Sequence, residues 1–328
     1  MISVIIPTYN SKKTLLLLIS ALKKTTLKNY QIIVIDDAST DNTQTAIKKI
    51  KSVHYFKFKK NKGAATTRNK GALVSRGDIL LFLDSDILPT FDIISYVSKF
   101  FKTKKNKSIC ITGFPGTLSE NTSFTQKYKY YRDWTYWTLD KNQNSFYHFR
   151  PAIGAISKKY FNQAGGFNQK YPGATMEDME FSYRLANCGQ IIFKKDLKVQ
   201  HQFGSFNKLT LSYFRRTTFF ASLFLSQKKF TGVAMTNSEA STIFFAGLIT
   251  FLIPVSILIP YAIIPLVITI IYYLYLQRRF ISHIFKHEGL VFTVKSIFLS
   301  FWLYLVIITA TIYYFLTSNS IKLTNRSL

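Results

Sequence analysis

Apolar runs alternate with stretches of mixed polarity through the first 205 residues. The apolar runs predict buried strands over 2–7, 31–37, 53–58 and 79–83. The stretches between them have the residue spacing of helices, at 12–24, 41–51 and 64–76. Because strands that alternate with helices form a mostly parallel sheet, the pattern predicts an α/β domain over residues 1–205. Ligands of such domains bind at the carboxyl ends of the strands.

The hydrophobic pattern changes after residue 238. Residues 240–277 contain no charged side chain, and the same is true of 296–321. One helix over 240–277 would extend about 57 Å, nearly twice the roughly 30 Å hydrocarbon core of a bilayer. A hairpin of two shorter helices that turns near Pro260 fits the bilayer better. We therefore expect a transmembrane region over 239–328 with about three spans, at 240–258, 261–277 and 296–317.

A third region, residues 206–238, lies between these two. Over 208–230 large apolar residues alternate with Lys and Arg. This alternation is typical of an amphipathic helix that lies in the membrane interface. A helix that packs on the α/β domain would give the same alternation, and both placements stay open at this stage.

Charges beside the apolar runs predict how the chain crosses the membrane. The segment between the second and third spans carries Arg278, Arg279, Lys286 and Lys295, whereas the tail carries Lys322 and Arg326. Basic residues favour the cytoplasmic side. With a cytoplasmic N-terminal domain, three spans place the basic segment inside and the tail outside. Two spans would reverse both positions.

Composition narrows the class of partner. The formal net charge is +27, which in a soluble domain suggests nucleic acid. Here 48% of the residues are hydrophobic and the apolar runs gather near the C-terminal end, so anionic membrane lipids are the expected partner and nucleic acid is not. Cys110 and Cys188 form neither a metal-binding spacing nor a disulfide framework, which fits a reducing compartment.

The N-terminal sequence indicates where the α/β domain resides. It begins with a strand-like run and lacks a basic region followed by a cleavable apolar one, so we expect a cytoplasmic domain. The glycosylation sequons at Asn106, Asn121 and Asn325 are then interpreted as chance matches.

Paired aspartates follow two of the predicted strands. Asp84-Ser85-Asp86 comes after 79–83, and two carboxylates so spaced can share a divalent cation that holds a diphosphate. Alone, this pattern is more often a solvated turn. Asp36-Asp37 closes the strand at 31–37. Because neighbouring parallel strands end at one crevice, both pairs are expected at one site.

Two further clusters carry candidate chemistry. Gly63 precedes a predicted helix whose N-terminus suits a phosphate, and Arg68 adds positive charge there. Glu177 and Asp178 begin another helix. An ion-paired helix start would explain such acids, through pairs such as Glu180 with Arg184. A general base, which takes a proton from an attacking hydroxyl, is the functional interpretation.

Taken in order, these motifs resemble the family 2 inverting glycosyltransferases, which have the GT-A fold, a Rossmann-like and mostly parallel sheet. The resemblance covers about residues 1–205. The matching segments are 4–10, 34–41, 62–65 with 68–69, 83–86, 165–167, and 177–178 with 183–184.

The resemblance implies a UDP- or GDP-sugar donor. Contacts to the donor's base and ribose are expected from Pro7, Thr8, Tyr9 and Asp37. The cofactor it implies is Mg²⁺ or Mn²⁺ on the diphosphate, held by Asp86 and Asp84. His201, after the strand-like run 197–200, is a candidate third ligand, although a lone His is often structural. Asp178 matches the catalytic base, and one displacement by the acceptor hydroxyl inverts the anomeric configuration.

The remaining candidates are substrate-binding residues, and Asp84 is counted among them as well as among the metal ligands. Arg68 and Glu177 are expected to bind substrate, and so are Arg215 and Arg216. The last two occupy the general place of the Gln-x-x-Arg-Trp motif of processive synthases, but the Gln and the Trp are missing. We therefore expect non-processive transfer to a hydroxyl of a lipid-linked or cell-envelope glycan.

Other functions remain as alternatives at this stage. A polyprenyl-phosphate acceptor is the closest of them, and a non-enzymatic membrane scaffold is another. Selectivity is expected to lie in the segment 113–155, which is rich in aromatic residues. Three of these could stack on sugar rings or pack internally, namely Tyr131, Trp134 and Trp137.

Overall fold

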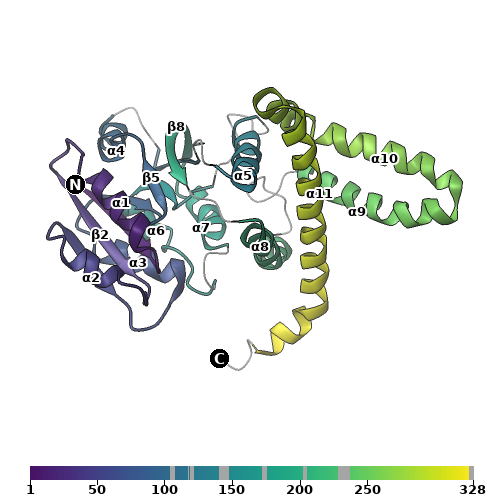
Figure 1. Cartoon of the computed structure of the whole chain (residues 1–328). Coiled ribbons are helices and arrows are strands. Elements are labelled where there is room, and N and C mark those ends of the chain that lie inside the picture. The colour runs from purple at the N-terminus through teal and green to yellow at the C-terminus, as the bar shows by residue number, and fades with distance from the viewer. Residues whose placement is uncertain are drawn as a thin grey trace. The chain divides into compact units, whose positions relative to one another are not determined.

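The computed structural model describes residues 1–103, 108–116, 118, 122–139, 148–171, 176–201, 205–227 and 237–324 (Figure 1). The chain divides into two compact units. The first, which we call the sheet unit, comprises Met1–Ser119 and Phe146–Gln202, and the second, the helical unit, comprises Glu120–Ser145 and Phe203–Leu328. Glu120–Ser145 thus groups with the C-terminal helices. The three sequence regions 1–205, 206–238 and 239–328 stay a prediction. The sequons at Asn106, Asn121 and Asn325 lie outside the described residues.

The N-terminal half of the sheet unit is parallel, as the apolar runs predict. Its strands are β1 (Ile2–Thr8), β2 (Tyr30–Asp36), β3 (Val53–Lys57) and β4 (Ile79–Leu83). β1 pairs in parallel with both β2 and β4, and β2 pairs in parallel with β3. The connecting helices are α1 (Lys12–Leu22), α2 (Thr43–Lys48) and α3 (Gly63–Val74). The predicted α/β fold class is confirmed.

The rest of the sheet mixes strand directions. Its strands are β5 (Ile87–Pro89), β6 (Cys110–Pro115), β7 (Ile153–Ser157) and β8 (Ile191–His201). Its helices are α4 (Ile93–Lys102), α6 (Lys158–Gln163) and α7 (Glu177–Ala186). Over the described residues the strand order is β3-β2-β1-β4-β7-β6-β8-β5. β7 is antiparallel to β4 and β6, and β8 is antiparallel to β5.

This order positions the site in two ways. The aspartates that follow β2 and β4 lie at the carboxyl ends of strands that flank β1. The short strand β5 pairs with the end of β8, and Ile87 lies opposite His201. His201 is thereby brought next to the residue that follows Asp86, although more than a hundred positions separate them in sequence.

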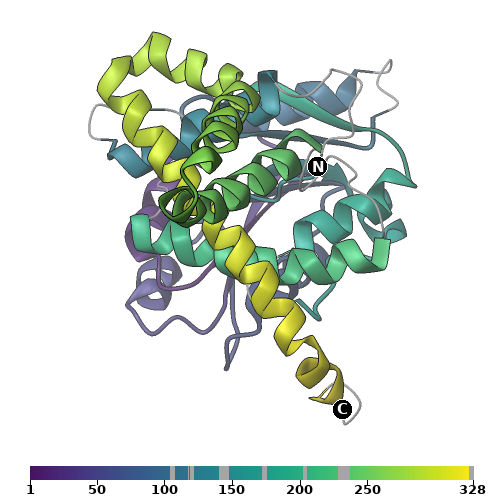
Figure 2. The ribbon, with the colours of Figure 1, turned by 90° about the vertical axis from the view of Figure 1, so that its right-hand side faces the viewer.

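The helical unit contains the apolar segments. Its elements are α5 (Phe124–Trp134), η1 (Thr135–Leu139), α8 (Phe206–Gln227), α9 (Asn237–Leu258), η2 (Pro260–Ala262), α10 (Ile263–Leu276) and α11 (Arg278–Thr324). α9 and α10 form a helical hairpin that turns at η2, near Pro260 as predicted (Figures 1 and 2). α11 changes direction at Gly289, whose φ of 78° and ψ of −174° are not helical (Figure 2).

Two of these helices are long and apolar enough to cross a membrane. They are Asn237–Leu258 and Arg278–Thr317, whereas the apolar stretch Pro260–Leu276 is shorter. Many large apolar side chains of α9 and α10 are exposed, including Phe251, Ile257, Tyr261 and Ile268. Helices with this surface suit a lipid environment. The number of spans stays a prediction.

Candidate active site at the carboxyl edge of the sheet

The loops after β1 and β2 hold each other at the sheet edge. The backbone N–H of Asp37 donates to the carbonyl of Thr8 (2.9 Å), and the side-chain oxygen of Asn10 accepts from the N–H of Thr40 (2.8 Å). Pro7 is half-buried and Thr8 is buried, whereas 52% of Tyr9 is exposed. Of the predicted nucleotide contacts, Pro7 and Thr8 therefore end strand β1, and Tyr9, which follows them, is open to solvent.

The two adjacent aspartates after β2 differ in their surroundings. The Asp36 carboxylate is fully buried, where it accepts from the N–H of Ser39 (2.7 Å) and from the Tyr55 hydroxyl. The Asp37 carboxylate accepts from the N–H groups of Lys62 (2.7 Å) and Gly63 (2.9 Å), which begin α3. Each carboxylate oxygen has a second lone pair, so these bonds leave acceptor capacity at Asp37. Asp36 thus stabilises the turn, and Asp37 is the member that links two segments of the edge.

Arg68 of α3 joins two acidic motifs. Its guanidinium donates to Asp84 Oδ1 (2.9 Å) and to Glu177 Oε1 (3.0 Å), and only 4% of the residue is exposed. Burial lowers the pKa of Arg68, but the charges of Asp84 and Glu177 outweigh it, so the net shift is upward. Arg68 therefore stays cationic and fixes the aspartate that follows β4 relative to the start of α7.

The start of α7 gives each of its three acids a different partner. Glu177 pairs with Arg68, and Glu180 pairs with Arg184 across 2.7 Å, the predicted i,i+4 pair. Asp178 lies between them in sequence, and its Oδ2 is 4.0 Å from His148 Nε2. The ion-paired helix start is thus present, and it leaves Asp178 facing an imidazole.

His148 is a site residue that sequence reasoning missed. It lies in the segment 113–155, which is rich in aromatic residues. A single His in such a segment belongs to no recognisable motif. To predict its role, one would have to know that it lies beside Asp178. That residue is 30 positions further along the chain, and the two come together only in the folded sheet unit.

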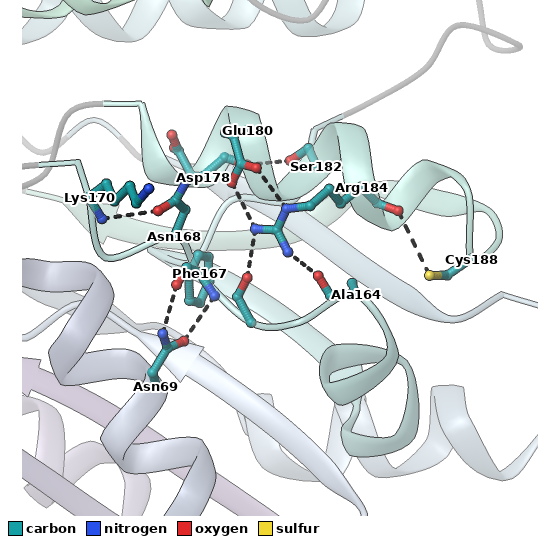
Figure 3. Close-up of polar contacts among 11 residues, drawn as sticks. Asn69, Ala164, Phe167, Asn168, Lys170, Asp178, Glu180, Ser182, Arg184 and Cys188 are labelled. Atoms are coloured by element: carbon teal, nitrogen blue, oxygen red, sulfur yellow. Dashed lines mark hydrogen bonds and ion pairs between the residues drawn. The ribbon is translucent and has the colours of Figure 1, made fainter. Parts of the chain in front are cut away.

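A second arginine holds the Gly165-Gly166-Phe167 loop against α7 (Figure 3). The Arg184 guanidinium donates to the carbonyls of Ala164 and Gly166 while it pairs with Glu180. The loop is also held from α3, because Asn69 donates to the Phe167 carbonyl (2.7 Å) and accepts from the Phe167 N–H (2.9 Å). Gly165 and Gly166 both have positive φ, 79° and 65°, which suits glycine.

The candidate metal ligands meet at the junction of β4, β5 and β8. His201 Nε2 lies 3.6 Å from Asp86 Oδ1, and 45% of the Asp86 side chain is exposed. Burial raises the pKa of Asp86; His201 opposes this shift and the neighbouring charge of Asp84 adds to it. In the described part of the chain no three His, Cys, Asp or Glu side chains converge on one point. An oxygen and an imidazole fit a cation that takes its other ligands from phosphates, as Mg²⁺ does.

The remaining candidates lie on the helical unit. Arg215 and Arg216 are exposed on α8. Tyr131 and Trp137 are buried, and the Tyr131 hydroxyl donates to Glu288 (2.9 Å), so these rings pack inside their own unit. Trp134 stacks on Tyr130 with ring centroids 6.3 Å apart. Of the predicted sugar-stacking aromatics, Tyr131 and Trp137 therefore serve internal packing.

Comparison with solved structures identifies the architecture. A mannosyltransferase from Pyrobaculum calidifontis, solved in complex with GDP-Man and Mn²⁺, matches with a TM-score of 0.58 and 14% sequence identity. The match covers 96% of this chain and 86% of that one. At this identity the likeness concerns the fold, and the fold is that of the GT-A glycosyltransferases.

Sequence comparison identifies the family. Residues 3–164 match the family model described as Glycosyl transferase family 2. The N-terminal part of this chain is therefore a family 2 glycosyltransferase domain, as the order of its motifs predicts.

Characterised relatives align over part of their length. A UDP-Glc:alpha-D-GlcNAc-diphosphoundecaprenol beta-1,3-glucosyltransferase of Escherichia coli is 38% identical over 107 residues, 32% of this chain and 43% of that protein. A poly(ribitol-phosphate) beta-N-acetylglucosaminyltransferase of Staphylococcus aureus is 44% identical over 93 residues, 26% of this chain and 28% of that protein. In both cases the aligned region is less than half of the relative.

Proposed function

We propose that this chain is a membrane-anchored, non-processive, inverting glycosyltransferase. It moves a sugar from a nucleotide-sugar donor to a hydroxyl of a lipid-linked or cell-envelope glycan. The observation that carries the proposal is the pairing of Arg68 with both Asp84 and Glu177, because it brings acids from two motifs together with an arginine from a third. A family 2 domain at residues 3–164 supports the reaction class.

Asp178 is the general base of the proposed reaction. It takes the proton of the acceptor hydroxyl while the hydroxyl oxygen forms a bond to the anomeric carbon. The bond from that carbon to the diphosphate oxygen breaks on the opposite face, and the nucleoside diphosphate departs with its electron pair. A single displacement inverts the anomeric configuration. Glu177 is held by Arg68, whereas the Asp178 carboxylate lies 4.0 Å from the His148 imidazole.

The donor lies along the edge formed by the loops after β1, β2 and β4. The Pro7-Thr8-Tyr9 backbone and Asp37 hold the base and ribose, since an ionised carboxylate accepts hydrogen bonds from both. Asp86, Asp84 and His201 would hold Mg²⁺ or Mn²⁺ beside the donor's diphosphate. The cation, when bound, neutralises charge on the leaving group. Arg215 and Arg216 are proposed to contact substrate from α8.

The acceptor is proposed from the relatives. The Escherichia coli relative is named for transfer onto a diphosphoundecaprenol-linked sugar, and the Staphylococcus aureus relative for transfer onto poly(ribitol-phosphate). Both names describe acceptors of the cell envelope that offer hydroxyl groups. Two apolar helices of spanning length support a membrane anchor that would keep the enzyme near such acceptors, with the sheet unit in the cytoplasm.

The function is tested by a sugar-transfer assay with the full chain in detergent and Mn²⁺. The donors are UDP-glucose, UDP-GlcNAc and GDP-mannose, and a cell-envelope lipid extract supplies the acceptor. Asp178→Asn and Asp86→Ala are expected to abolish sugar transfer, whereas Asp196→Asn, an exposed aspartate on β8, is the matched control and keeps it. Full activity of either site variant overturns its assigned role. Acid-labile product that contains one sugar and no glycan would instead identify a polyprenyl phosphate as the acceptor.

A further inference from the structure

We propose that His148 is a positioning residue for Asp178. This inference rests on the proposed role of Asp178 as the base and adds a second residue to that role. His148 Nε2 lies 4.0 Å from Asp178 Oδ2. A direct hydrogen bond is shorter, at about 2.7–3.2 Å, so the imidazole N–H reaches the carboxylate through one bridging water or after a small closing movement.

Burial gives this contact its strength. Only 7% of the His148 side chain and 13% of the Asp178 side chain are exposed. Polar groups so removed from solvent interact more strongly than they would in water, because the local dielectric is lower. A donor beside a buried carboxylate therefore has a measurable effect on the orientation of that carboxylate.

The main chain of His148 is fixed to the helix that carries Asp178. The N–H of the next residue, Phe149, donates to Ser182 Oγ (2.9 Å), and the same hydroxyl donates to the Asp178 carbonyl (2.5 Å), a bond shown in Figure 3. Phe149 itself is fully buried and packs edge-on against Phe82. The separation of His148 and Asp178 is thus set by one shared hydroxyl and a packed ring.

The charged groups around Asp178 leave a distinct task to His148. Arg68 of α3 pairs with Glu177, and Arg184 pairs with Glu180 on α7 itself. Within Asp178, Oδ1 accepts from the Met179 N–H (2.9 Å) and Oδ2 faces His148. The helix N–H bonds to one oxygen and the imidazole lies nearest the other, so together they can set the plane of the carboxylate.

The chemical consequence is orientation of the base. In this role the imidazole donates its N–H and takes no proton from the acceptor. The proton from the acceptor hydroxyl stays on Asp178 until product leaves. Loss of the imidazole lets the carboxylate rotate about its side-chain bonds, and misplacement of a reacting group by about 1 Å can cost about a hundredfold in rate.

Two substitutions separate positioning from mere packing. His148→Leu fills the space without a donor, and His148→Gln restores an N–H close to the position of Nε2. The readout is release of nucleoside diphosphate from UDP-glucose, UDP-GlcNAc or GDP-mannose with Mn²⁺. We expect His148→Leu to lower kcat by about tenfold to a hundredfold with KM for the donor unchanged, and His148→Gln to recover part of it. His54→Leu, at an exposed position of β3, is the matched control.

The outcomes are distinguishable from failure of the proposed function. Wild-type kcat in His148→Leu, with Asp178→Asn inactive, overturns this inference alone. Activity in Asp178→Asn overturns the proposed base.

Discussion

Arg68 and Glu177 form a buried ion pair at 3.0 Å, although they are 109 positions apart in sequence. The pair joins the helix that follows β3 to the helix that carries the proposed base. Because Arg68 also bonds to Asp84, a substitution at any of the three residues alters the electrostatic environment of the other two. The site is therefore one connected charge network, and several expectations follow from its geometry.

Removal of one partner from this network is expected to destabilise the protein. Arg68→Met leaves Glu177 buried without its cation, and breaking a buried pair in this way costs about 3–5 kcal/mol. The double variant Arg68→Met with Glu177→Met is expected to recover much of that loss, because the more buried of the two acids is then gone, and the Asp84 side chain, which is 29% exposed, can be hydrated. Thermal unfolding of the purified proteins measures the stability of the single and the double variant. Asp78→Asn removes an exposed ion pair with the N-terminus and serves as the control, with a cost below about 1 kcal/mol.

Chelation is expected to abolish donor binding. Asp86 and His201 supply few ligands of their own, so a cation here depends on the donor phosphates and the donor depends on the cation. Calorimetry with UDP-glucose and GDP-mannose, before and after EDTA and with Mn²⁺ restored, measures the effect. His201→Gln is expected to weaken Mn²⁺-dependent binding about tenfold or more. Donor binding that survives EDTA unchanged would rule out a metal-held diphosphate.

Asp92 is expected to make stability pH-dependent. Its carboxylate accepts from the Ser95 N–H at the start of α4 and from Thr25 and Thr26 after α1. Burial raises the pKa of Asp92, but these hydrogen bonds outweigh it and hold the pKa well below its usual range. A depressed folded-state pKa adds stability above the unfolded value of about 3.9, and this stability is lost as pH falls through the folded value.

The measurement for Asp92 is the melting temperature from pH 2 to 7, compared between wild type and Asp92→Ala. At neutral pH the variant is expected to lose about 1–2 kcal/mol with its helix cap. The difference should narrow below about pH 4, where the unfolded carboxylate begins to protonate. Asp92→Asn keeps a capping oxygen and is the control for charge. A difference that is constant with pH would show that the carboxylate charge contributes nothing.

Arg184 is expected to affect activity through the glycine loop. Its guanidinium bonds to the carbonyls of Ala164 and Gly166 and to Glu180 at once (Figure 3). Arg184→Lys keeps the charge but not the planar fork, so it should release the loop while Glu180 stays paired. We expect a lower kcat and a lower melting temperature together. Lys159→Arg, on α6, provides a conservative exchange of basic residues outside this network.

The position of the C-terminus tests the number of spans. A protease-cleavable tag after Leu328 is expected to be cleaved from the outside of intact cells or spheroplasts if the chain crosses three times. Protection from outside, with cleavage only after lysis, would favour two spans and place the basic segment that includes Arg278 and Arg279 on the outer side. A second tag at the N-terminus should be protected in either case, because the sheet unit is proposed to be cytoplasmic.

Local pattern predicted the strands of the parallel half within one or two residues. Apolar runs such as 79–83 are buried on both faces of the sheet, so each strand can be predicted from its own residues alone. The strands β6, β7 and β8 of the mixed half were harder to predict, because their pairing partners are distant in sequence. In addition, β6 and β8 pair in parallel across a register shift. The kink at Gly289 was likewise not visible as a break in the helical pattern.

The sequence by itself determined the order of motifs, the acids at the ends of strands and the apolar segments, because these depend on local spacing and residue type. Only the tertiary structure decided the partners. Arg68 was predicted to bind phosphate, and in the structure it pairs with two acids. His201 lies beside Asp86 because β5 pairs with β8. His148, which the sequence did not indicate as a site residue, faces Asp178. These contacts join segments far apart in the chain, and no local pattern encodes which distant group a side chain will meet.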